Sequence, residues 1–132
     1  MIDQFNAKDN PRVVVIQKLY SYYLNKDSLI IYPKHKYKKF IKDVVKGSIE
    51  RDELIQNLIN NNFKEDINNY KTELILKIII KAALFEFMFM HKIPIKVVIT
   101  EYLKVSDFFV NNSQKKFLNA ILDKASKVSR FK

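Results

Sequence analysis

The sequence predicts an all-α fold: one compact domain of about six to seven helices that spans residues 1–132. Only one glycine and three prolines occur in 132 residues, and no Asn-Gly or Asp-Gly pair is present. The turn chemistry that β-hairpins need is therefore missing. Apolar residues instead recur three to four positions apart, which is typical of amphipathic helices. Because no linker, repeat or change in composition interrupts the chain, we expect a single domain.

The helices are expected at residues 11–26, 36–48, 50–62, 72–91, 94–109 and 113–128, with ends placed to within ~2–4 residues. Pro11 follows Asn10 and opens the first helix, and Pro94 opens the fifth, because proline fits the first helical position. The second and third helices can also form one element through Gly47. The fourth carries aromatic and methionine side chains around its whole circumference, which predicts a central, buried helix.

The last helix has two distinct faces, with Asn112 or Ser113 as the expected N-cap. At about 100° per residue, the core face holds Phe117, Leu118, Ile121, Leu122 and Ala125. A polar stripe within roughly 60° on another side holds Lys116, Asn119, Asp123 and Lys127. One face is therefore expected to be core and the other solvent-exposed and rich in lysine.

Several classes of protein are disfavoured by the composition. The chain has no cysteine, which excludes disulfides, thiolate metal sites and cysteine nucleophiles. Its two histidines show no metal-ligand spacing, and one glycine cannot build a phosphate loop or a dinucleotide-binding motif. The longest apolar stretch, Ile78–Met90, is interrupted by charges and is too short for a membrane span. We expect a soluble, cytoplasmic protein with no catalytic site, metal or cofactor.

The positive charge is unevenly distributed. The net charge is +10, and the segments Lys34–Lys46 and Ser113–Lys132 each hold six basic residues and one acid. Clustered positive charge is typical of a nucleic-acid binder, because neutralised phosphates release counterions. The alternative is a solvated lysine face without function, in a chain that uses lysine, asparagine and isoleucine heavily.

Five blocks in chain order resemble the NusB family of bacterial transcription antitermination factors. The C-terminal blocks are Pro94, Lys96, Val97, Ile99 and Glu101, then Lys116, Phe117, Asn119, Leu122, Asp123 and Lys124. The upstream blocks are Lys81, Ala83, Leu84, Phe85 and Glu86, the segment Ile41–Gly47, and Arg12, Gln17, Leu19 and Tyr20. The chain departs from the family pattern at Val110, Lys115 and Ala120, where the family usually shows Gly, His and Gly. Its amino-terminal arginine cluster is reduced to Lys8 and Arg12.

The resemblance implies a helical domain that binds boxA-type RNA of ribosomal RNA leaders together with NusE, a ribosomal small-subunit protein, within the RNA polymerase antitermination complex. It implies that the first and last helices pack together. The RNA-binding residues would then be Arg12, Gln17, Lys115, Lys116, Asn119, Asp123 and Lys124. Lysines would contact phosphates, and the amides of Gln17 and Asn119 would contact base edges. Both amides can equally be ordinary solvated side chains.

The same resemblance places Glu86 at the contact with the protein partner. The alternative for Glu86 is an ion pair on the helix surface with Lys81 or a neighbour of Met90. Two other functions stay open: an RNA-binding module in ribosomal RNA processing or modification, and a helical protein-interaction domain whose charge is incidental.

Two groups of tyrosines allow different interpretations. Tyr20 and Tyr23 share the apolar face of the first helix, so core packing is the favoured expectation for them. Tyr32 and Tyr37 flank the lysine-rich segment 34–46 and remain candidates for stacking on bases.

Overall fold

The computed structural model describes residues 7–70 and 72–130, for residues 69 and 70 the backbone alone. Within these ranges the chain forms seven α-helices, preceded by a short 3-10 turn η1 at Ala7–Asp9, and no strand. The helices are α1 Pro11–Leu24, α2 Lys38–Glu50, α3 Asp52–Asn62, α4 Lys64–Tyr70, α5 Leu74–Phe89, α6 Ile95–Ser106 and α7 Asn112–Ser129. The all-α prediction is confirmed.

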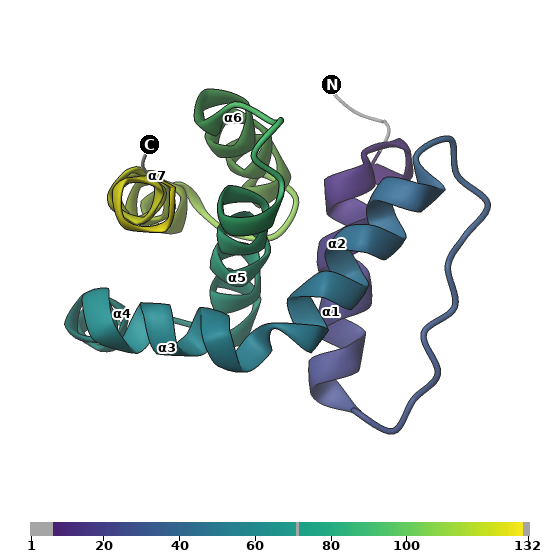
Figure 1. Ribbon diagram of the computed structural model, residues 1–132, viewed down its shortest axis with the longest axis horizontal. Helices are drawn as coiled ribbons and strands as arrows, with labels where there is room; N and C mark the ends of the chain where they lie inside the picture. Colours follow the sequence, from purple (N-terminus) through teal and green to yellow (C-terminus); the bar gives the residue numbers. More distant parts are fainter. Residues whose placement is uncertain (1–6, 71, 131–132) are drawn as a thin grey trace.

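Helix α5 lies at the centre of the molecule (Figure 1) and packs against α1, α2, α3, α6 and α7. Ten of its residues are buried, which follows from its sequence, since a helix that is apolar all round must be enclosed. The prediction for this segment is confirmed. The hydrophobic core includes buried side chains from all seven α-helices.

Two asparagine caps fix where helices begin. The Asn10 side chain accepts hydrogen bonds from the backbone amides of Arg12 (3.0 Å) and Val13 (3.3 Å) and so starts α1. Asn111 and Gln114 form a reciprocal capping box at α7, with bonds of 2.8 and 2.9 Å. The expectation of residue 112 or 113 as the cap of α7 was therefore wrong by one or two positions.

Helix α4 was not expected as a separate element. The chain turns at Phe63, which is buried together with Ile67 on α4, so the break lets both side chains reach the core. Helices α2 and α3 are also separate, divided at Arg51 rather than joined through Gly47.

Gly47 allows α2 and α5 to approach closely. A methyl group built at Gly47 would stand 2.2 Å from the nearest ring atom of Phe85 on α5, closer than non-bonded carbons tolerate. The interpretation of this glycine as a packing position is confirmed.

The segment from Asn25 to Tyr37 runs back along the α1–α2 pair to reach the start of α2 (Figure 1). Helices α1 and α7 lie on opposite sides of α5 in the same view. Among the described residues, no helix combines the length and apolarity needed to cross a membrane.

Candidate nucleic-acid interface

The expected site joins α1 to α7, but the structure does not bring these helices together. Helix α1 packs on α2, α5 and α6, whereas α7 packs on α5 and α6. The expectation that the first and last helices pack side by side is therefore wrong, because α5 and α6 stand between them (Figure 1).

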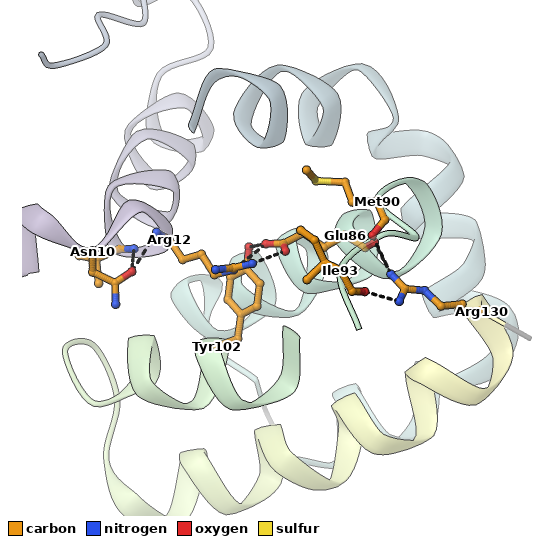
Figure 2. Close-up of polar contacts among 8 residues, drawn as sticks. Asn10, Arg12, Glu86, Met90, Ile93, Tyr102 and Arg130 are labelled. Carbon is orange, nitrogen blue, oxygen red and sulfur yellow. Dashed lines mark hydrogen bonds and ion pairs between the residues drawn. The ribbon is translucent and has the colours of Figure 1, made fainter. Parts of the chain in front are cut away.

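The Arg12 side chain points into the molecule rather than toward solvent (Figure 2). Its Nε and Nη2 atoms donate to the two carboxylate oxygens of Glu86 at 3.0 and 2.7 Å. The hydroxyl of Tyr102 donates a short hydrogen bond to the same carboxylate. The guanidinium also lies over the rings of Phe40 and Tyr102, 4.7 and 5.6 Å from their centres. Arg12 is 9% exposed, and its charge is paired with that of Glu86 inside the fold.

The surroundings of Arg12 and Tyr102 shift both of their pKa values upward. Burial alone would lower the pKa of Arg12, but the hydrogen bond and the charge of Glu86 raise it above its ordinary value. Burial and the adjacent Glu86 carboxylate raise the pKa of Tyr102 well above 10, so its hydroxyl keeps its proton and donates. The network therefore links α1, α5 and α6 through a charged pair and a neutral tyrosine.

Glu86 is an interior residue and not part of an exposed partner surface. Its exposure is 0%, and Arg12 and Tyr102 occupy both carboxylate oxygens. The expectation that Glu86 contacts a protein partner is corrected accordingly. The surface ion pair with Lys81 is also wrong, because Lys81 pairs with Asp52 at 2.9 Å.

Two members of this region were not expected from the sequence. Tyr102 lies on the buried face of α6 with Val98 and Val105, and a buried tyrosine hydroxyl needs a partner. Arg130, just after α7, donates to backbone carbonyls at and beyond the end of α5, those of Glu86, Phe87, Met90 and Ile93. Figure 2 shows its side chain reaching toward Met90 and Ile93. Arg130 thus fixes the C-terminal end of α7 to the centre of the fold.

A second polar cluster holds the end of α1. Asp52 on α3 accepts hydrogen bonds from the Tyr23 hydroxyl at 2.5 Å and from Lys81 at 2.9 Å. Burial alone would raise the pKa of Asp52, but these hydrogen bonds lower it. Tyr23 is half-buried, whereas Tyr20 is 37% exposed, so the expectation of core packing is wrong for Tyr20.

We call the polar residues Lys115, Lys116, Asn119, Asp123, Lys124 and Lys127 together the α7 stripe, and most of its charge is locally compensated. Lys115 pairs with Asp107 at 2.9 Å and Lys124 with Asp66 at 3.3 Å, both carboxylates coming from other elements. Asp123 pairs with Lys127 at 3.4 Å. Lys116 and Asn119 are exposed on the same helix. The stripe therefore presents less free charge than its sequence indicates.

Gln17 is exposed on the side of α1 that faces the segment before α2. It lines a hollow with Lys18, Lys34 and Lys36 rather than with any residue of α7. The structure thus separates Gln17 from Asn119, the other amide of the expected site. Among the described residues, no group of three or more histidine or acidic side chains could hold a metal ion.

Comparison with known proteins places the chain in a family. The protein-family model described as "NusB family" matches residues 2–127 of the chain. The chain belongs to the NusB family. The transcription antitermination protein NusB of Rickettsia massiliae is 26% identical over 121 residues, covering 86% of this chain and 75% of that protein. The protein of the same name from Rickettsia bellii is 31% identical over 83 residues, covering 63% and 53%.

A solved NusB structure has the same fold. T. maritima NusB superposes with a TM-score of 0.76 at 21% sequence identity, covering 95% of this chain and 93% of that one. The NusB-like helical fold predicted from the sequence is therefore confirmed.

Proposed function

We propose that this chain is a noncatalytic transcription antitermination factor that acts by binding RNA. The observation that carries the proposal is membership of the NusB family along residues 2–127, together with relatives named as transcription antitermination proteins. A net charge of +10, concentrated in two segments of the chain, supports RNA as the ligand.

The RNA in this proposal is a single-stranded boxA-type element of ribosomal RNA leaders, bound together with the ribosomal protein NusE. On α7, Lys116 and Asn119 are the exposed residues that meet RNA directly. Lys115 and Lys124 join them after exchanging their carboxylate partners for phosphates, while Asp123 limits the affinity by its negative charge. Arg12 and Glu86 support this surface from within the fold and do not touch the ligands.

The mechanism is that of an adaptor. One surface holds a short unpaired RNA and another holds the ribosomal protein, so two modest contacts are joined within one complex. No covalent chemistry is required of the chain in this role. Its effect on transcription would come from the assembly it stabilises around RNA polymerase.

A binding titration tests the proposal. Labelled boxA RNA and a scrambled RNA of equal length are titrated with the protein, with and without NusE, at several salt concentrations. The proposal predicts a preference for boxA that grows when NusE is present, and a log–log salt slope of roughly −0.7 per phosphate contact. Equal affinity for both RNAs would instead favour a general RNA-binding module. Absence of binding to either would favour a protein-interaction domain.

A further inference from the structure

One hollow lies between the start of α1 and the segment before α2, and a second lies on the exposed face of α2. The first, about 590 Å³, is lined among others by Lys8, Gln17, Lys18, Lys34, Lys36 and Tyr37. The second, about 560 Å³, is lined by Lys38, Lys39, Lys42, Asp43 and Lys46. Tyr37 lines the first hollow, and Lys38, the next residue along the chain, lines the second. We call the two together the lysine groove.

The positive charge of the lysine groove is largely uncompensated. Its lining holds eight lysines against two aspartates, Asp9 and Asp43. Among the described residues, the one ion pair of these lysines joins Lys39 to Asp43 at 2.9 Å. On α7, by contrast, Lys115, Lys124 and Lys127 each have a carboxylate within 3.4 Å. The groove therefore offers phosphates more free charge than the α7 stripe does.

One wall of the groove is held in place by His35. Its Nδ1 accepts a hydrogen bond from the backbone amide of Tyr37 at 2.9 Å. Because that nitrogen is an acceptor, Nε2 carries the hydrogen and donates to the Lys8 carbonyl at 3.0 Å. This bridge ties the segment before α2 to η1. The lysines on either side of His35 are thus presented from a braced backbone.

Two tyrosine rings lie among these lysines. Tyr37 is 47% exposed, and the ammonium group of Lys36 is 5.6 Å from its ring centre. Lys42 lies 5.7 Å from the ring centre of Tyr32. Aromatic faces beside cations suit a strand whose bases stack while its phosphates are neutralised. Stacking of this kind requires unpaired bases, which favours a single strand over a duplex.

We propose that the lysine groove is a seat for single-stranded RNA, separate from the α7 stripe. Phosphates bind Lys34, Lys36, Lys42 and Lys46, and a base stacks on Tyr37. Gln17, at the α1 side of the groove, then reaches a base edge. This inference rests on the proposed function, since it assumes RNA as the ligand, and it adds where the RNA binds.

Matched charge variants test the location. The groove variant carries Lys34→Gln, Lys36→Gln, Lys42→Gln and Lys46→Gln. The control variant carries Lys64→Gln, Lys77→Gln, Lys92→Gln and Lys96→Gln, four exposed lysines on other parts of the surface. Both lose the same net charge, so a difference between them reports position rather than total charge. Fluorescence anisotropy with a labelled 12-nucleotide oligouridylate is measured between 50 and 200 mM salt.

The groove variant is expected to bind weakly, with a log–log salt slope smaller by roughly 3, because four phosphate contacts are lost. The control variant is expected to keep most of the slope of the unmodified protein. Equal losses in the two variants would overturn the groove while leaving RNA binding intact. If the unmodified protein bound no RNA, the proposed function would fall as well, so the two failures are distinguishable.

Two further variants test the stacking. Tyr37→Ala is expected to weaken binding between about 5-fold and about 150-fold, the usual loss for one stacked base. Tyr37→Phe keeps the ring and is expected to bind like the unmodified protein. An affinity of Tyr37→Ala within 2-fold of the unmodified protein would overturn the stacking, and equal competition by a 12-base-pair duplex would overturn the preference for a single strand.

Discussion

Replacing Arg12 with methionine is expected to destabilise the fold by about 3–5 kcal/mol, because it strands a buried charge. The Glu86 side chain is 0% exposed, and Arg12 provides two of the three hydrogen bonds described for its carboxylate. Methionine fills similar space but cannot donate, so the carboxylate keeps only the Tyr102 hydroxyl. Against a typical domain stability of about 5–15 kcal/mol, this is a large fraction.

A double-mutant cycle combines Arg12→Met with Glu86→Gln, which removes the negative charge of Glu86 but keeps an acceptor for the Tyr102 hydroxyl. The double variant is therefore expected to be destabilised by only about 1–2 kcal/mol, less than Arg12→Met alone. Urea unfolding followed by circular dichroism, at constant pH, gives the free energies of unfolding for all four proteins. A loss below about 1 kcal/mol for Arg12→Met, or additive losses in the double variant, would refute the buried pair.

The same variant separates a structural role from an RNA-binding role. At a low temperature at which Arg12→Met is still folded, its affinity for RNA is expected to lie within 2-fold of that of the unmodified protein. A tenfold loss of RNA affinity with an intact fold would mean that the guanidinium meets phosphate after all.

Three other changes have defined outcomes. The pKa of Tyr102 is raised above its unfolded value near 10, so unfolding releases a proton above that pH and the free energy of unfolding falls as pH rises. Tyr102→Phe should show a smaller fall of the free energy of unfolding between pH 9.5 and 11, and a pH dependence identical to that of the unmodified protein would contradict the assignment. Gly47→Ala should lower the free energy of unfolding in urea by about 1 kcal/mol, because the clash with the Phe85 ring outweighs the higher helix propensity of alanine. Adding Phe85→Leu should remove that loss, and a Gly47→Ala variant that is more stable than the unmodified protein would show that the ring moves freely. Asp123→Asn should tighten RNA binding several-fold at moderate salt, because it removes a negative charge near phosphate and releases Lys127; unchanged or weaker affinity would place Asp123 outside the site.

The fold was accessible to sequence reasoning because local signals and global packing agree. Helix α5 is apolar around its circumference and is largely buried, whereas α7 is apolar on one face and buries that face. Local breaks were harder to predict. Helix α3 ends at Phe63, whose side chain is buried in the core. Such a turn is set by tertiary packing, which periodicity does not encode.

The candidate site was less accessible because it depends on pairings distant in sequence. Arg12 and Glu86 are 74 positions apart, and nothing in either local pattern indicates that each neutralises the other. The α7 lysines read as free charge in the sequence, whereas Asp107 and Asp66 reach them from other elements. The lysines of segment 34–46 are mostly without carboxylate partners among the described residues, because the segment holds only one acid, so its composition alone predicted its free charge.

Amide chemical-shift mapping of the isotope-labelled protein, titrated with single-stranded RNA, tests the central claim most directly. The account predicts that the largest changes fall on residues 34–46 and Gln17, with smaller changes near Lys116 and Asn119. Changes confined to surfaces outside the lysine groove and the α7 stripe, or no changes at all, would contradict it.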